Sequence, residues 1–120
     1  MKPYIVILDR QHIAGEPRVP GYEHVWVEYP RTAAADCADH LWRASIGVTC
    51  ATPIDRQAIA AAHKLGLVVV LGPDAGIVDV GACRERGIRI VHLPAESGPD
   101  QTHMERLMDV IDAYVARTRD

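Results

Sequence analysis

The sequence contains no phenylalanine, few other aromatic residues and only three cysteines. Cys37, Cys50 and Cys83 are odd in number and form no CxxC pair, which argues against a disulfide framework or a zinc ribbon. No apolar run approaches the ~20 residues that a membrane-spanning helix needs. The first apolar run reaches Asp9 too early for a secretory signal peptide. We therefore expect a cytoplasmic protein with reduced thiols.

A large excess of charge of one sign is also missing. The chain has 13 basic and 16 acidic residues, with a net charge of −3. This balance argues against dedicated binding of nucleic acid or of a membrane surface. With 120 residues, of which 48% are hydrophobic and 24% charged, the chain is expected to form a single domain over residues 1–120.

Short apolar runs alternate with polar stretches that have helical periodicity. The expected strands are residues 4–8, 24–29, 45–50, 67–71 and 88–91. The expected helices begin near residues 32, 55 and 79, and a long C-terminal helix covers residues 98–117. Strands joined through helices pair in parallel by right-handed crossovers. The pattern predicts a doubly wound α/β fold, with a five-stranded parallel sheet and helices on both faces.

Position-specific signals refine this prediction. The alternation of polar and apolar residues in 24–29 predicts a half-exposed edge strand, whereas the continuous run 67–71 predicts a central one. Asp55 and Asp79 are placed to cap the helices that follow them. Gly66 is expected to end a helix in the left-handed conformation.

Ligands of such sheets bind beyond the carboxyl ends of the strands, where the segment Gly72–Gly76 follows the strongest strand. The segment is not GxGxxG and contains a proline, and it lacks the Lys-Ser/Thr pair of a P-loop, so no cofactor-binding residue is assigned. Two interpretations stay open. It is a tight turn with glycine at positive φ, or its amides hold a small anion or carboxylate.

No autonomous catalytic constellation is visible, and no catalytic residue is assigned. The six histidines never take HxH or HExxH spacing, so no metal site is predicted. His92 and His103 flank the last loop, where an imidazole could act as acid or base, and Asp74 lies in the glycine segment. Ser97 is not in a GxSxG motif and is interpreted as a helix cap.

Between residues 46 and 114 the sequence contains several short motifs in a characteristic order and spacing. They are Thr52-Pro53-Ile54-Asp55, His63-Lys64-Leu65, Val69-Val70-Leu71-Gly72, Ile77-Val78-Asp79, Ala82-Cys83-Arg84-Glu85-Arg86-Gly87-Ile88, Leu93-Pro94 and Ser97. On these residues the chain resembles the substrate domain of the D-isomer-specific 2-hydroxyacid dehydrogenases. The resemblance implies a flavodoxin-like fold.

In that family the backbone of the glycine loop helps to hold the substrate carboxylate. The resemblance therefore implies ligand-binding residues here, namely Thr52, Gly72, Pro73, Asp74, Ala75, Gly76 and Ser97. Asp74 stands where the family has its second glycine, and its charge would repel an anionic substrate unless it points away. The GxGxxG cofactor loop of the family is absent from these 120 residues, as are its catalytic arginine, glutamate and histidine.

Three functions remain open, and whether the chain is an enzyme stays undecided. The first is a non-redox homologue of the substrate domain that binds a small ligand or a partner. The second is one subunit of a split oxidoreductase, with NAD supplied only through that partner. The third is a cofactor-free enzyme whose site at a dimer interface uses His92, His103 or Asp74. A homodimer is expected through apolar residues of the C-terminal helix, namely Met104, Leu107, Met108, Ile111 and Tyr114.

Overall fold

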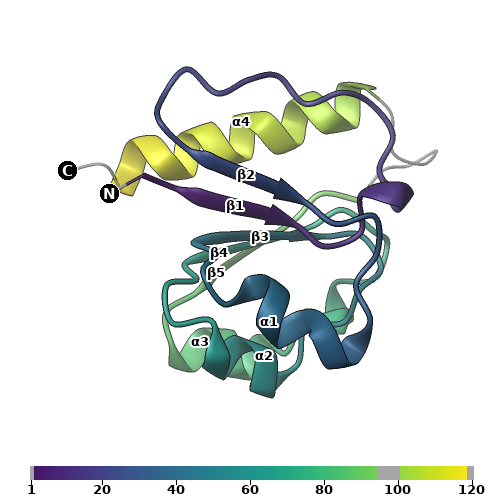
Figure 1. The fold of residues 1–120 in the computed structure, drawn as a ribbon, viewed down its shortest axis with the longest axis vertical. Coiled ribbons are helices and arrows are strands. Elements are labelled where there is room, and N and C mark those ends of the chain that lie inside the picture. Colours follow the sequence, from purple (N-terminus) through teal and green to yellow (C-terminus); the bar gives the residue numbers. More distant parts are fainter. Residues whose placement is uncertain (1, 95–100, 119–120) are drawn as a thin grey trace.

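The computed structural model describes residues 2–94 and 101–118. The strands are β1 (Tyr4–Ile7), β2 (Val25–Glu28), β3 (Ile46–Thr49), β4 (Leu67–Val70) and β5 (Arg89–His92). The α-helices are α1 (Cys37–Leu41), α2 (Arg56–Ala61), α3 (Val80–Glu85) and α4 (Gln101–Thr118). Short 3-10 turns cover Arg10–His12, Ala34–Asp36 and Ala75–Ile77. Figure 1 shows the strands side by side between the helices.

All strand pairs are parallel, and the strand order is β2-β1-β3-β4-β5. This is the flavodoxin-like order, in which β2 is added on one side of β1 and β3 to β5 are added on the other, so that the strand order reverses between β1 and β3. The predicted five-stranded parallel sheet is therefore confirmed. β2 is an edge strand as expected. β4 lies inside the sheet and is buried throughout, but β3 occupies the centre.

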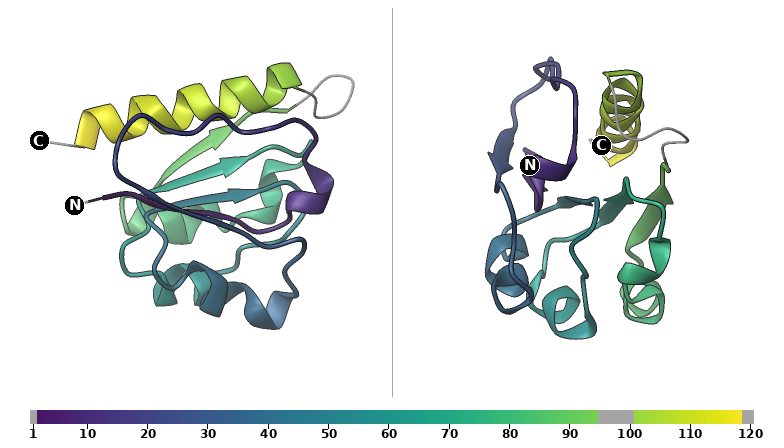
Figure 2. Two further views of the ribbon diagram at one scale, coloured as in Figure 1. Left: turned by 45° about the horizontal axis from the view of Figure 1, so that its top comes forward. Right: turned by 90° about the vertical axis from the view of Figure 1, so that its right-hand side faces the viewer.

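The sheet separates two apolar layers, with α4 on one face and α1, α2 and α3 on the other (Figure 2). Under α4 the cluster consists of Ile5, Ile7, Ile13, Ile46, Val48, Leu67, Val69, Leu71, Met104, Leu107, Met108, Ile111 and Val115. The strand residues of the opposite cluster include Val6, Val68 and Val70, which alternate in sequence with those under α4. Neither described layer contains a helix that is long and apolar enough to cross a membrane.

The burial of α4 corrects the expectation that its apolar residues form an exposed surface for dimerisation. Met104, Leu107, Met108 and Ile111 are at most 2% exposed because they pack on this chain's own sheet. A stripe with a period of 3.6 residues marks a buried face, but it does not say whether the covering surface belongs to the same chain. Tyr114 is only partly buried. Self-association itself stays a prediction.

The structure at the N-termini of α2 and α3 tests the predicted caps. Asp55 and Asp79 each accept a hydrogen bond from a first-turn amide, at 2.9 Å, and both predictions are confirmed. The expected role of Gly66 is wrong, because its φ is not positive and α2 already ends at Ala61. The hydroxyl of Tyr114 packs against Gly66 instead, so a Cβ there would displace the end of the tyrosine side chain.

The helix expected from residue 32 is shorter than its pattern suggests, because it is split into the turn Ala34–Asp36 and the helix α1. Only Cys37 and Leu41 of α1 are buried.

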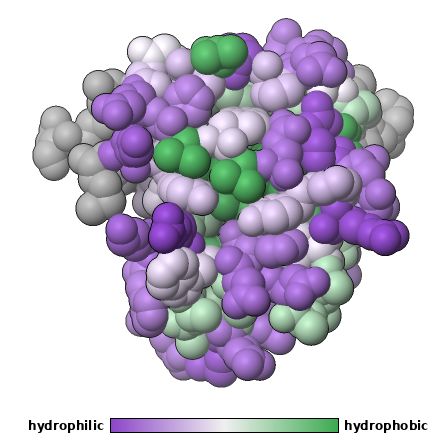
Figure 3. Space-filling model, in the orientation of Figure 1, coloured by the Kyte–Doolittle hydropathy of each residue, from purple (hydrophilic) through white to green (hydrophobic). Residues whose placement is uncertain are grey.

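On the face seen in Figure 3, apolar residues gather near the middle, over β1 and β2, and hydrophilic residues surround them. This is the half-exposed edge that the alternation in residues 24–29 predicted, with Val25, Trp26 and Val27 all of intermediate burial.

Burial makes Cys37 a probe of the fold. Loss of hydration, together with the nearby charge of Asp55, raises the pKa of the Cys37 thiol from 9.0 to about 11. The unfolded thiol ionises first as the pH rises, so the unfolding free energy should fall from about pH 9 to about pH 11. Denaturant titrations across this range should show a steeper fall for the natural sequence than for Cys37→Ala. Equal slopes would contradict the prediction.

Candidate functional site

The carboxyl edge of the sheet is organised around a buried carboxylate. Asp9 follows β1 and is 1% exposed. Its Oδ1 accepts a hydrogen bond from the amide of Cys50 at 2.9 Å. Its Oδ2 accepts from the amides of Ala51 and Thr52, at 2.7 and 3.1 Å, and from the Thr52 hydroxyl at 3.0 Å. The loop after β3 thus forms an anion-binding concavity that this chain's own carboxylate fills.

Sequence reasoning missed the role of Asp9. The available signal was an acid directly after a buried apolar strand, followed after the neighbouring strand by a short turn rich in amides. Within the described residues Asp9 has no cationic partner, so backbone dipoles stabilise its charge. Thr52, predicted to bind a ligand, is 6% exposed and directs its hydroxyl to Asp9. It belongs to the support of this edge.

The glycine loop, Gly72 to Gly76, lies beside this concavity. Its Gly72 does not have the positive φ that the tight-turn interpretation required. The residue is glycine because a Cβ there would overlap the carbonyl oxygen of Cys50. The carbonyl of Gly72 is also 2.7 Å from Nε2 of His92, which donates a hydrogen bond to it. The first residue of the loop is therefore fixed from two sides.

The carboxylate of Asp74 turns back on its own loop. It accepts a hydrogen bond from the amide of Gly76 at 2.8 Å and caps the short 3-10 turn. One amide that could have held an anion is therefore occupied. The amides of Asp74 and Ala75 take part in none of the hydrogen bonds that the described residues form. The amide of Gly72 takes part in none of these hydrogen bonds either, and Pro73 has no N–H, so the loop offers a ligand the amides of Gly72, Asp74 and Ala75.

The remaining candidates lie close to this loop but serve the backbone. His103 is 4% exposed, and its Nε2 is hydrogen-bonded to the carbonyl of Leu93. His92, one residue before Leu93, is exposed at the end of β5 and bonds to Gly72. Ser97 lies outside the described residues. The structure thus gathers His92 and the glycine loop at one place.

Neither a metal site nor a reactive thiol emerges at this edge. The part of the chain that the structure describes contains no group of three His, Cys, Asp or Glu residues that could hold a metal ion. Burial, with a smaller contribution from the charge of Asp9, raises the pKa of the Cys50 thiol. The thiolate is the nucleophilic form, so Cys50 is poorly suited to covalent chemistry.

The opposite, amino edge of the sheet carries a cavity of about 640 Å³. Its lining consists of Lys2, Tyr4, Val25, Trp42, Arg43, Ser45, His63 and Lys64. These residues begin or precede the strands or follow the helices, whereas the loops singled out from the sequence follow the strands. This cavity was not predicted from the sequence. Its residues are scattered from position 2 to position 64 and share no motif.

Comparisons with known proteins place this fold. The chain is 31% identical over 88 residues to a putative 2-hydroxyacid dehydrogenase of Haemophilus influenzae, a match that covers 72% of this chain and 28% of that protein. No family profile matches. The resemblance to 2-hydroxyacid dehydrogenases noted in the sequence is thus confirmed as homology to one of them. The chain spans less than a third of the length of this relative.

Two solved structures share the fold. One is an acyclic imino acid reductase in complex with NADPH and D-Arg, with a TM-score of 0.58 at 14% identity. The match covers 76% of this chain and 31% of the reductase. The other is the NAD⁺-bound 3-phosphoglycerate dehydrogenase of Entamoeba histolytica, with a TM-score of 0.58 at 19% identity. It covers 77% of this chain and 33% of that enzyme.

Proposed function

We propose that this chain is a substrate-domain homologue that binds a small carboxylate at the carboxyl edge of its sheet and carries out no hydride transfer by itself. One observation carries the proposal. The glycine loop presents the amides of Asp74 and Ala75 without intramolecular partners, in a chain homologous to a 2-hydroxyacid dehydrogenase. Paired backbone donors are the usual means of binding a carboxylate oxygen.

The loop is suited to binding because it is already ordered. His92 and the close approach to Cys50 fix Gly72, and the Asp74 carboxylate fixes Gly76. A ligand that docks on such a loop loses less free energy to ordering the protein. We expect 2-oxo and 2-hydroxy acids to be the ligands, because the homologous enzyme carries the name of that class.

The absence of redox turnover is supported by the state of the acid-base candidates. Asp74, His92 and His103 are each hydrogen-bonded to backbone atoms at this edge. Hydride transfer also requires a donor held against its acceptor in a closed cleft. The part of the chain that the structure describes forms one side of such a cleft at most.

A second function is favoured by the coverage of the relatives. This chain matches 28% of a dehydrogenase and about a third of two structures solved with NADPH or NAD⁺. The remaining length of those proteins is absent from this match, so this chain could be one subunit of a split oxidoreductase. In that case NADH oxidation with glyoxylate should appear only when a separately produced nucleotide-binding chain is added.

The binding function is tested by following backbone amides in a ¹H–¹⁵N correlation spectrum during titration with glycolate or glyoxylate. We expect the largest shifts at Asp74 and Ala75, with smaller ones at His92. NADH with glyoxylate should give no oxidation with this chain alone. Shifts spread evenly over the chain, or no shifts at millimolar ligand, would overturn the proposed site.

Asp74→Asn should strengthen binding of glycolate by roughly fivefold to tenfold, because it removes a like charge from the loop. The asparagine oxygen can still accept the hydrogen bond from Gly76, so the turn is expected to persist. The matched control is Asp36→Asn, since Asp36 is exposed and makes no capping hydrogen bond. Both variants change the net charge equally. Equal gains in the two would mean that net charge, and not the loop, governs binding.

A further inference from the structure

We propose that the amino-edge cavity is a second binding site, for a small phosphorylated molecule that carries a planar ring, of the type represented by a nucleoside monophosphate. The proposal is independent of the carboxylate function, because the two sites lie at opposite edges of the sheet. The volume of the amino-edge cavity, about 640 Å³, falls within the range of ~300–1,000 Å³ typical of small-molecule pockets.

The floor of the cavity is built from strand starts and is tightly connected. The backbone amide of Tyr4 donates to Oγ of Ser45 at 2.9 Å, and the amide of Ser45 donates to the carbonyl of Tyr4 at 2.9 Å. The carbonyl of Ser45 in turn accepts from Gly66 at 2.9 Å. The cavity therefore rests on β1, β3 and β4, which are the three inner strands of the sheet.

The lining is basic in an acidic protein. Lys2, Arg43 and Lys64 line the cavity together with His63, and no carboxylate is among the lining residues. The whole chain has a net charge of −3, so this distribution is opposite to the average. Like charges placed around one concavity attract an anion to it.

Two of the three basic side chains of the cavity form no ion pair with a carboxylate of the described residues. Arg10, Arg18 and Arg56 form ion pairs with carboxylates, but among the described residues Arg43 and Lys64 form none. Asp39, one helical turn before Arg43, does not pair with it. Lys2 has Glu23 as a partner at 3.7 Å, and both side chains are more than half exposed, so this pair is weak.

Helix ends are the competing explanation, since α1 and α2 end near the cavity and cations favour such ends. The carbonyls at the end of α2 already have a cation. The guanidinium of Arg86 donates to the carbonyls of Ile59, Ala62 and His63. Lys64 is therefore not required to cap α2 and remains available to a ligand.

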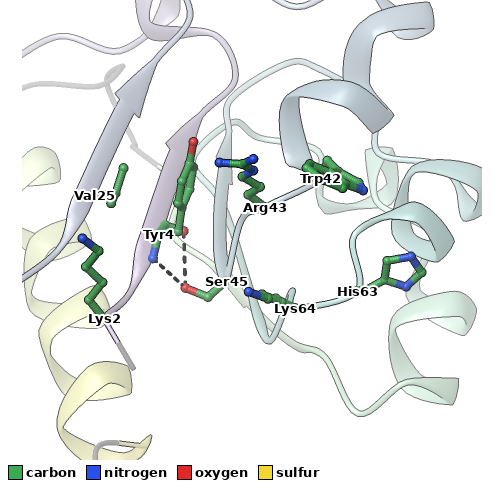
Figure 4. A pocket seen from close by; sticks show the side chains of 8 residues that line it. All are labelled: Lys2, Tyr4, Val25, Trp42, Arg43, Ser45, His63 and Lys64. Atoms are coloured by element: carbon green, nitrogen blue, oxygen red, sulfur yellow. Dashed lines mark hydrogen bonds between the residues drawn. The ribbon is translucent and has the colours of Figure 1, made fainter.

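A planar surface lies beside these charges. Trp42 is 54% exposed and is one of three exposed large hydrophobic residues in the described chain. The guanidinium carbon of Arg43 lies 5.2 Å from the centroid of its ring, at cation–π distance. In the view of Figure 4, Arg43 lies between Tyr4 and Trp42. An indole held at the rim of a basic cavity is suited to stacking on a planar ring.

The combination favours a phosphate over a carboxylate as the anionic group. A phosphate monoester carries a charge of about −1.5 to −2 near pH 7 and offers three acceptor oxygens. Arg43 supplies a fork of donors, and Lys2 and Lys64 supply compact charges from other segments. A single carboxylate would leave part of this charge uncompensated.

The test uses the full chain and three probes: AMP, adenosine and inorganic phosphate. Binding is followed by calorimetry and by the amide shifts of Arg43, Ser45 and Lys64. We expect AMP to bind with a dissociation constant below about 1 mM, and adenosine and phosphate alone to bind at least about tenfold more weakly. Absence of AMP binding at several millimolar, or equal binding of phosphate and AMP, would overturn the proposal.

Variants locate the site. Arg43→Gln and Lys64→Gln should each weaken AMP binding about tenfold. Trp42→Leu should weaken AMP but leave phosphate unchanged. Arg84→Gln removes the same charge from an exposed position on α3 and is the matched control. If Arg84→Gln weakens AMP as much as Arg43→Gln, or if Arg43→Gln and Lys64→Gln lower only the melting temperature, the cations serve net charge or helix ends and the site is refuted.

Discussion

Asp9→Ala is expected to lower the unfolding free energy by about 3–5 kcal/mol, a large part of the total stability of a small domain. The substitution removes the acceptor of four hydrogen bonds, three of them from backbone amides that cannot move away. The amides of Cys50 and Ala51 would then lose their acceptor, whereas the amide of Thr52 would keep its second acceptor, Oγ1 of Thr49 at 2.9 Å. The change should appear in urea or guanidinium unfolding curves as a lower midpoint.

The control for this prediction is Asp36→Ala. Asp36 is exposed and its side chain caps nothing, so its loss should change the unfolding free energy by no more than about 0.5 kcal/mol. Asp9→Asn should fall between the two, because one amide oxygen remains as acceptor while an NH₂ group replaces the second. A stability of Asp9→Ala equal to that of Asp36→Ala would show that Asp9 does not join β1 to β3.

Gly72→Ala is expected to destabilise the fold by about 3 kcal/mol or more, although its backbone angles are accessible to any residue. The added Cβ would overlap the carbonyl oxygen of Cys50, which is backbone and cannot rotate away. Either β4 or the Asp9 concavity must shift. Thermal unfolding should show a clear drop in midpoint, and the glycolate-dependent shifts at Asp74 should weaken as well.

Gly81→Ala provides the comparison. Gly81 lies in α3, is exposed, and a Cβ there would meet its nearest neighbour, Asp79, at an ordinary 3.5 Å. Alanine is the better helix former by about 1 kcal/mol, so this variant should be neutral or more stable. A loss of stability in both variants would indicate a general intolerance of side chains rather than the specific overlap at Gly72.

Most of the fold was predictable because its determinants are local. Local patterns indicated which faces of an element are buried. Examples are the continuous apolar run from Leu67, the alternation in residues 24–29 and the apolar stripe on α4. The aspartates at positions 55 and 79 act within one helical turn, so sequence spacing alone located them. The crossovers predicted parallel pairing, and the flavodoxin-like fold was implied by the family resemblance alone.

The parts that could not be predicted depend on contacts between distant residues. Gly66 and Gly72 were interpreted through local φ, whereas the structure shows close contacts with distant residues, with the Tyr114 side chain at Gly66 and with the backbone carbonyl of Cys50 at Gly72. Thr52 was assigned to a ligand through the family resemblance, and no local signal indicated that its hydroxyl donates to Asp9, 43 residues earlier. The amino-edge cavity has no sequence motif, because its residues meet only when β1, β3 and two helices are in place.

The position of α4 also has a consequence for biosynthesis. One face of the sheet, with Ile5, Val48 and Val69, depends on a helix that begins only at Gln101. After translation of residue 85 the three helices of the other face have all been made, but this face has no cover until α4 has been translated as well. The nascent polypeptide therefore exposes an apolar surface until α4 emerges from the ribosome. Chaperones that recognise apolar surfaces can bind it during that time.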